Sequence, residues 1–214
     1  MNVFDEEKRG FTALYTPSRS EDGITVAILL ELLRQPHSVH IVDKVEAIND
    51  VEARNTATLL PAIVDTADSG VKKIIDGNLI TEYLLGRYDK DLKLSCPEGS
   101  NQAREVDDWL SFLNGSAHHF QPPSGDNLSG EETTPSVREV LRIYLHLEQQ
   151  LQKMLTQYLV GSRLTLADLV AFPFAATADS YGLDLERFPQ VTALYNRLMS
   201  EHFVRRALAA VKIA

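Results

Sequence analysis

The chain has 214 residues, of which 44% are hydrophobic and 24% charged, enough for one large domain or two small ones. Its formal net charge is -9 at pH 7, and an acidic surface repels phosphates, which argues against direct nucleic-acid binding. The single cysteine, Cys96, excludes an intrachain disulfide and fits a reducing compartment. No signal peptide or membrane-length apolar run is readable, so we expect a cytoplasmic protein with no membrane contact.

The first part of the chain alternates between strand-like and helix-like patterns. Its expected elements are a strand at 11–15, a polar turn at 16–23, an amphipathic helix at 26–33, a strand at 38–43, a weakly helical stretch at 46–58, strands at 60–65 and 72–75, and a helix ending at Tyr88. The order is β-α-β followed by β-β-α. We therefore expect a small α/β domain over 1–88.

The second part of the chain reads as helical throughout. A polar segment with Pro and Gly at 89–101 is expected to be a linker, and an all-helical domain is expected over 102–214. Its expected elements are a helix around 106–113, a polar loop at 114–135, a long helix at 140–158, an apolar helix at 166–179, and final helices at 190–200 and 203–211.

The strongest local motif is YLVGSRLTLADLVAF, at 158–172. Thr165 is placed to cap the helix that follows, and Asp168 stands three positions later. A hydroxyl at the cap can accept from the amide at the third helical position, while the carboxylate reaches back to the amide of the cap. This pair is predicted to be a structural cap and not a catalytic pair.

These motifs together resemble the glutathione-transferase superfamily. The segment YLVGSRLTLADLVAF is similar to its helix-capping segment, Leu60-Pro61-Ala62 to the loop before its third strand, and AREVDDWLSF (103–112) to the first long helix of its second domain. The resemblance covers nearly the whole chain. It implies an α/β thioredoxin-like N-terminal domain plus an all-α C-terminal domain.

The resemblance also implies where glutathione would bind. A hydroxyl near the start of the first helix would stabilise the thiolate, with Ser18 and Ser20 as catalytic candidates, and the amides of the helix N-terminus would help. The implied glutathione-contacting positions are Tyr15, Leu60, Pro61, Asp76, Gly77 and Asn78.

The chain departs from the family pattern where an acidic residue and a serine hold the γ-glutamyl group. Here the pair is Asp76-Gly77, so the hydroxyl is missing and only the amide of Gly77 could donate. One lost hydrogen bond to a charged group costs about 1.5–3 kcal/mol, or roughly ten- to a hundredfold in affinity.

AREVDDWLSF and YLVGSRLTLADL also resemble the glutathione-transferase-like domains of aminoacyl-tRNA synthetases, of the synthetase-complex scaffold proteins and of the elongation-factor-one gamma subunit. This likeness favours an assembly domain of the translation machinery without efficient transferase activity. Its partners would be other such domains, as a homodimer or heterodimer. The implied contact surfaces are the helix at 76–88 and a second surface containing Arg163 and Arg187.

Two other functions stay open. One is a glutathione-dependent transferase or isomerase acting on a small electrophile, and the other is an enzyme of secondary metabolism that has this fold but no longer uses glutathione. No metal site is expected, because His118 and His119 have no third ligand at a suitable spacing. No cation adjoins Cys96 in sequence, so a reactive thiol is not expected.

Overall fold

The computed structural model describes residues 10–42, 60–66, 71–117, 137–154 and 156–213. The chain divides into two compact units, one comprising Met1–Asp91 with Met199–Ala214 and the other Leu92–Leu198. The last helix thus lies with the first unit, although its sequence position suggests the helical domain; the boundaries at 1–88, 89–101 and 102–214 stay predictions. Among the described residues, no helix is long and apolar enough to cross a membrane.

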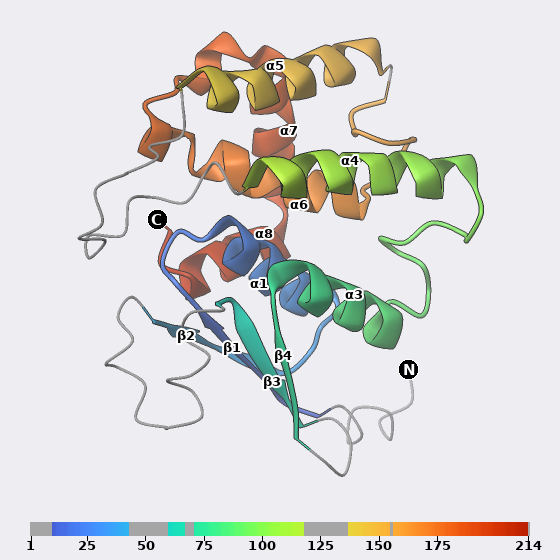
Figure 1. The fold of residues 1–214 in the computed structure, drawn as a ribbon, viewed down its shortest axis with the longest axis vertical. Coiled ribbons are helices and arrows are strands. Elements are labelled where there is room, and N and C mark those ends of the chain that lie inside the picture. The colour runs from blue at the N-terminus through green and yellow to red at the C-terminus, as the bar shows by residue number, and fades with distance from the viewer. Residues whose placement is uncertain (1–9, 43–59, 67–70, 118–136, 155, 214) are drawn as a thin grey trace. The chain divides into compact units, whose positions relative to one another are not determined.

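The first unit is built on a four-stranded sheet (Figure 1). Its strands are β1 (Thr12–Thr16), β2 (His37–Ile41), β3 (Ala62–Asp65) and β4 (Lys72–Ile75). They lie in the order β2-β1-β3-β4, with β1 and β2 parallel and the other neighbours antiparallel. This confirms the thioredoxin-like arrangement expected from the sequence. The helical stretch expected at 46–58 lies outside the described residues.

Three helices of the first unit lie on one side of this sheet (Figure 1): α1 (Glu21–Leu32), α3 (Gly77–Tyr88) and α8 (His202–Ala210). Helix α1 packs against β1, α3 and α8, and all of its residues from Gly23 to Leu30 are buried. A helix that is apolar on all sides is stable in water only when it is covered on all sides. Helix α1 is therefore the centre of the core of this unit.

The start of α1 differs from the sequence expectation. Residues 16–23 are not all turn, because the helix begins at Glu21 and Ser20 is its N-cap. Gly23 lies inside the first turn of the helix, where an added Cβ would be 1.9 Å from the Oγ1 atom of Thr16. The glycine is thus required by the close approach of α1 to β1 and does not mark a turn.

The second unit is helical, as expected. It contains α4 (Asn101–Ala117), α5 (Val137–Lys153), α6 (Leu166–Ala176) and most of α7 (Pro189–Ser200), with short 3-10 turns at Ala178–Tyr181 and Leu185–Arg187. Helix α5 ends at Lys153, so the prediction that it continues to Tyr158 is wrong. In its core, the buried Tyr144 hydroxyl donates to the carbonyl of Phe174.

The polar loop expected at 114–135 begins later than predicted. Helix α4 continues to Ala117, and residues 118–136 lie outside the described part of the chain. His118 and His119 are therefore not described. Among the described residues, no group of three or more His, Cys, Asp or Glu side chains is placed to hold a metal ion.

Candidate functional site

One edge of the sheet gathers most of the residues that the sequence predicts for a glutathione site. Tyr15, near the end of β1, is paired with Ala62 at the start of β3, and Ala62 is paired with Ile75 at the end of β4. The segments that follow β1 and β4 and the segment that precedes β3 therefore meet at this edge. The main-chain amide of Asp76 donates to the carbonyl of Pro61 over 3.2 Å, which ties two of these segments together.

Ser20 caps the N-terminus of α1. Its Oγ accepts from the amide of Gly23 over 3.2 Å. This bond uses a lone pair of the hydroxyl oxygen and not its hydrogen, so the hydroxyl can still donate to an anion. Ser18 is exposed in the turn between β1 and α1. Both predicted hydroxyls thus lie at a helix end whose amides favour negative charge.

Asp76 starts α3 from an unusual backbone conformation. Its φ is 78°, which a non-glycine residue adopts only rarely, and residues held this way are often found at functional sites. Its carboxylate accepts from the amide of Asn78 over 2.9 Å and from that of Leu79 over 3.3 Å. The Leu60–Pro61 peptide bond beside it is cis. Because the amide of Asn78 donates to Asp76, the protein itself already occupies this amide.

Asp22, which no sequence motif marks, explains the missing hydroxyl at position 77. A Cβ added to Gly77 would lie 2.6 Å from Cγ and 2.8 Å from Cβ of Asp22. The side chain of Asp22, in the first turn of α1, thus fills the space that a serine at position 77 would need. An acidic residue in a first helical turn is a weak signal by itself, and only the fold reveals that it faces α3.

Tyr15 is not brought together with the two serines. The side chain of Thr16 faces Gly23 of α1, and neighbouring residues of a strand point to opposite faces of the sheet. Tyr15 therefore points away from α1. There its ring stacks on that of His40 in β2, with ring centroids 4.9 Å apart.

This geometry can bind an anion and stabilise a developing negative charge. Two helix N-termini, those of α1 and α3, lie side by side at one edge of the sheet, as the approach of Asp22 to Gly77 shows. Each N-terminus carries amides with no partner inside its own helix. The half-exposed Asp22 and the exposed Asp76 add acidic side chains that would attract an ammonium group.

The cap of α6, in the second unit, is different. We call such a helix end closed, because a buried carboxylate of the protein itself accepts the hydrogen bonds there. The carboxylate of Asp168 accepts from the amide of Leu159 over 2.8 Å, and from the amide and the hydroxyl of Thr165, each over 2.9 Å. Asp168 is fully buried. Burial raises the pKa of this carboxyl above its ordinary value, while the three hydrogen bonds act in the opposite direction. The pair holds the loop before α6 to the helix.

The two predicted interaction arginines have different surroundings. The guanidinium of Arg163 donates to the carbonyls of Lys93 and Ser95, so it holds a neighbouring loop in place. Its Nη2 also lies 3.9 Å from Sγ of Cys96. The guanidinium is therefore a cation beside the thiol, and the sequence around the cysteine does not reveal it. Arg187 is exposed at the end of a 3-10 turn.

Comparisons with known proteins identify the family. Residues 14–92 match the glutathione S-transferase N-terminal domain, and residues 119–202 match the C-terminal domain. The chain is 30% identical over 205 residues to glutathione S-transferase-like protein tpcF of Aspergillus fumigatus, covering 87% of this chain and 90% of that protein. It is 26% identical to the similarly described gedE of Aspergillus terreus, covering 87% and 89%.

Solved structures agree with this fold. The glutathione transferase URE2P8 of Phanerochaete chrysosporium, solved with oxidized glutathione, has a TM-score of 0.77 and 24% identity, covering 94% of this chain and 95% of that one. The chain is also 25% identical to protein URE2 of Candida albicans, covering 95% of this chain and 71% of that protein. The chain belongs to the glutathione S-transferase family.

The interpretation as an assembly domain of the translation machinery is wrong. The relatives are glutathione S-transferase-like and URE2-type proteins. The structure gives a physical reason for the error. In AREVDDWLSF, Val106 and Trp109 are buried core residues, and YLVGSRLTLADL contains the buried cap of α6. Both motifs serve the shared fold, so they do not distinguish one branch of the family from another.

Proposed function

We propose that this protein is a glutathione-dependent transferase or isomerase that acts on a small electrophile. The observation that carries the proposal is the meeting of the N-termini of α1 and α3 beside Pro61, with Asp22 lying against Gly77. The family membership and the similarity to a glutathione transferase that was solved with oxidized glutathione support it.

Glutathione would supply the nucleophilic thiol. In this proposal the hydroxyl of Ser20 donates to the thiolate sulfur, and the amides in the first turn of α1 add their positive end. Ser18 is the second candidate for this donor. The thiol proton leaves to solvent, because a hydroxyl that donates a hydrogen bond stabilises the thiolate without accepting that proton. Attack of the thiolate then forms the bond to the electrophilic carbon, and the bond from that carbon to the leaving group breaks. With 1-chloro-2,4-dinitrobenzene the leaving group is chloride, which departs to solvent with the electron pair of that bond.

The rest of the peptide would be held by the start of α3 and the loop before β3. The amide of Gly77 would donate to the γ-glutamyl carboxylate, and Asp76 and Asp22 would attract the ammonium group beside it. The main chain at Leu60 and Pro61 would align the peptide beside the sheet edge. Tyr15 has no contact with glutathione in this proposal, because its ring lies on the opposite face of the sheet.

The sharpest test of the thiolate role is the replacement of Ser20 by glycine. Glycine at an N-cap costs only a few tenths of a kcal/mol relative to serine. The loss of one donor to a charged sulfur should lower kcat/KM with glutathione and 1-chloro-2,4-dinitrobenzene about ten- to a hundredfold. Ser20→Thr keeps the hydroxyl and should retain most of the rate.

A matched control is available in the second unit. The Oγ of Ser100 accepts from the amide of Ala103 at the start of α4, the same capping bond as that of Ser20. Ser100→Gly should match Ser20→Gly in stability and leave turnover unchanged. Calorimetric titration of the wild-type protein with glutathione comes first. If the folded protein neither binds glutathione at about 10 mM nor turns over the electrophile, the proposed function is wrong.

A homodimer is the second part of the proposal. Leu79 on the outer face of α3 is 55% exposed, which is unusual for a large apolar side chain. It lies beside Glu82, Tyr83 and Arg87 around a shallow hollow of about 690 Å³. Light scattering should give a dimer mass for the wild type, and Leu79→Glu should give a monomer. A monomeric wild type would refute this part and leave the catalytic proposal intact.

A further inference from the structure

A serine and a histidine form a hydrogen-bonded pair on the side of the sheet that faces away from α1. The Oγ atom of Ser38 lies 2.8 Å from Nε2 of His40, two positions further along β2. His37 of the same strand faces α1, since its Nε2 lies 3.6 Å from the carboxylate of Glu31. Side chains alternate along a strand, so Ser38 and His40 share the opposite face. Neither residue belongs to the proposed glutathione site.

The contact between these two side chains is the one that a nucleophilic serine requires. A serine hydroxyl is a weak nucleophile unless a base within about 2.6–3.2 Å takes its proton. When Nε2 of a neutral imidazole carries no hydrogen, it accepts from the hydroxyl, and the ring proton is on Nδ1. The separation of 2.8 Å is in this range, so His40 can act as a general base toward Ser38.

The ring of His40 is oriented by Tyr15 on the neighbouring strand. The two residues are direct neighbours in the parallel ladder of β1 and β2, and their rings stack at an interplanar angle of 18°. Stacked aromatic rings attract one another beyond the area that they bury, so the tyrosine limits rotation of the imidazole. A base that is oriented by a third group is a recurring feature of activated nucleophiles. Tyr15 is therefore a positioning residue for this pair.

An amide beside the serine can stabilise a negative oxygen. Strand β2 is an edge strand of the sheet, and β1 is its one neighbour among the described strands. The amide of Val42 donates to the carbonyl of Thr16 in β1. Amides of a strand alternate between its two sides, so the amide of Val39 points to the open edge. Val39 directly follows Ser38, as does one oxyanion donor in many serine hydrolases.

The surroundings of the pair suit a small substrate with an apolar group. His40 is exposed, and Ser38 and Tyr15 are half-buried, so a small molecule can reach the hydroxyl from solvent. Ala13 is paired with Ser38 in the ladder and with Val64 on its other side, and both of these apolar residues are half-buried. An apolar acyl or aryl group can therefore lie on this face beside the serine.

We propose that Ser38 and His40 form a second catalytic site, which hydrolyses small esters that carry an apolar acyl or aryl group. The Oγ atom of Ser38 attacks the carbonyl carbon while its proton passes to Nε2 of His40. The bond to the leaving oxygen then breaks, and the leaving group departs with the electron pair and takes that proton. Water attacks the acyl-serine ester and gives a proton to Nε2. The acid is released as the Ser38 oxygen leaves and regains a proton from His40.

Covalent labelling locates the nucleophile. The full chain is treated with diisopropyl fluorophosphate in the absence of glutathione, so the result does not depend on the proposed transferase activity. Attack by Ser38 displaces fluoride and leaves a stable phosphate ester. Ser38 carries the one hydroxyl side chain of the tryptic peptide 35–44, so mass spectrometry assigns the label without ambiguity. We expect this peptide to be labelled in the wild type and not in His40→Gln. No label on it would overturn the proposal.

Hydrolysis of p-nitrophenyl acetate tests the reaction. The wild type should release a rapid burst of about one nitrophenolate per chain, followed by slower turnover, because an acyl-enzyme accumulates. Ser38→Ala should abolish the burst, and His40→Gln should slow it about a hundredfold, the size of a general-base contribution. An exposed imidazole can also hydrolyse this ester by itself. That reaction would survive Ser38→Ala, and its survival at the wild-type rate would overturn the proposal.

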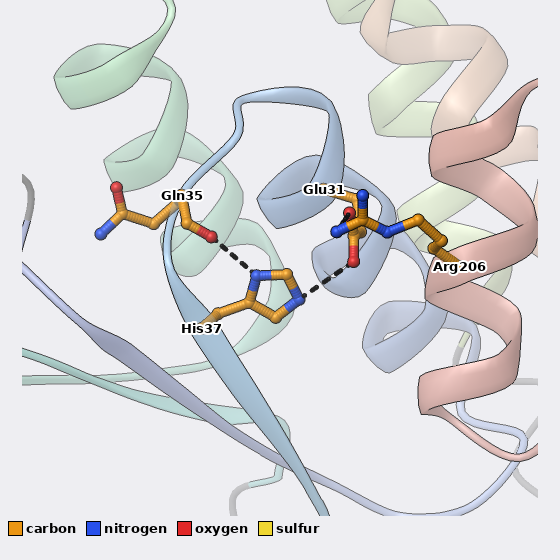
Figure 2. Close-up of polar contacts among 4 residues, drawn as sticks. All are labelled: Glu31, Gln35, His37 and Arg206. Carbon is orange, nitrogen blue, oxygen red and sulfur yellow. Dashed lines mark hydrogen bonds and ion pairs between the residues drawn. The ribbon is translucent and has the colours of Figure 1, made fainter. Parts of the chain in front are cut away.

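His37 provides a matched control on the same strand. Figure 2 shows its ring between Gln35 and Glu31, with Nδ1 2.7 Å from the main-chain carbonyl of Gln35. Glu31 also pairs with Arg206 over 2.8 Å. His37→Gln removes an imidazole from the opposite face of β2 and should leave both the labelling and the burst unchanged. A loss as large as that of His40→Gln would mean that damage to the strand, and not a lost base, explains both, and would overturn the proposal.

Two substitutions of Tyr15 test its positioning role. Tyr15→Phe keeps the stacked ring and should retain the burst rate. Tyr15→Leu removes the ring contact and should slow the burst about two- to tenfold, the usual range for an aromatic pair. Equal rates in the two variants would overturn the positioning role of Tyr15.

Discussion

Helix N-termini in the two units use their amides in opposite ways. At α6, the carboxylate of Asp168 is fully buried and accepts three hydrogen bonds from Leu159 and Thr165. At α1, the cap is Ser20, which is only partly buried and keeps its hydroxyl hydrogen for another partner. Both ends begin with residues that favour caps, so the type of the cap residue alone does not separate them. Burial decides which end is structural and which can meet a ligand.

The first prediction concerns the closed end and has the largest expected effect. Asp168→Ala removes the acceptor of two buried amides and a buried hydroxyl, each of which is left unsatisfied. The free energy of unfolding should fall by about 3–5 kcal/mol, measured by urea denaturation. Asp108→Ala on the exposed face of α4 is the matched control and should change it by less than about 0.5 kcal/mol. A loss at position 168 no larger than this control would contradict the closed-end interpretation.

A second closed end sharpens the comparison. The carboxylate of Glu148, buried in α5, accepts from the amides of Gln190 over 2.9 Å and Val191 over 3.0 Å at the start of α7. Glu148→Ala should lower the free energy of unfolding by about 2–4 kcal/mol, because the part-buried amide of Gln190 and the buried amide of Val191 lose their partner. Glu148→Gln keeps one acceptor oxygen and should lose about half as much. No loss for glutamine beside a full loss for alanine would mean that packing, and not the hydrogen bonds to the amides, sets the cost.

The sequence predicts these two closed ends unequally. Thr165 and Asp168 are three positions apart, so the capping motif is readable from spacing alone. Glu148 and Gln190 are 42 positions apart, and nothing local indicates that one caps the helix of the other. The strands and most helices were predictable for the same reason as the cap, because their hydrophobic periodicity is local.

The candidate site was predictable in its parts and not in its contacts. The sequence selects Ser20 and Asp76, because capping residues and the family resemblance mark them. It cannot show that Asp22 lies against Gly77, since this approach depends on how α1 and α3 pack. It also reads Gly23 as a turn residue, when the close approach to β1 is what excludes a side chain there. Spacing along one chain carries no information on such tertiary approaches.

The third prediction tests the place where the N-termini of α1 and α3 meet. Gly77→Ser introduces a Cβ that would lie 2.6 Å from Cγ of Asp22, so the side chain of Asp22 must move. We expect the free energy of unfolding to fall by about 1–3 kcal/mol, the usual cost of overpacking. Asp22→Ala removes the obstructing atoms beyond its own Cβ. The double variant should therefore recover part of the stability that Gly77→Ser loses, because the Cβ at position 22, 2.8 Å from the added Cβ, is still present.

The same double variant tests whether the missing hydroxyl matters. If a serine at position 77 donates to the γ-glutamyl group, Asp22→Ala with Gly77→Ser should bind glutathione about tenfold more tightly than Asp22→Ala alone in calorimetry. Asp22→Ala is the right reference, since it separates the new hydroxyl from the lost carboxylate. No gain in affinity would show that the γ-glutamyl group does not lie at this position. Additive stability effects would show that Asp22 and Gly77 are not in contact.

The last prediction concerns Asp65, a buried carboxylate at the opposite end of the strands from Asp76. Asp65 is almost fully buried and accepts from the hydroxyls of Tyr83 and Tyr88, each over 2.8 Å. Burial of the phenol and its hydrogen bond to Asp65 raise the pKa of Tyr88 to about 12, and the same causes raise the pKa of Tyr83. The folded state thus favours the protonated phenols, which donate, over the phenolates, which cannot.

The sign of the pH effect follows from this shift. A raised pKa in the folded state contributes stability that is complete below the unfolded pKa of about 10, and that is lost as the pH rises toward the folded pKa. The urea midpoint of the wild type should therefore fall between about pH 10 and 12 more steeply than that of Tyr88→Phe, which has one such phenol fewer. Tyr83→Phe should flatten the curve in the same way. Parallel curves for all three proteins would mean that Asp65 does not accept hydrogen bonds from these phenols in the folded state.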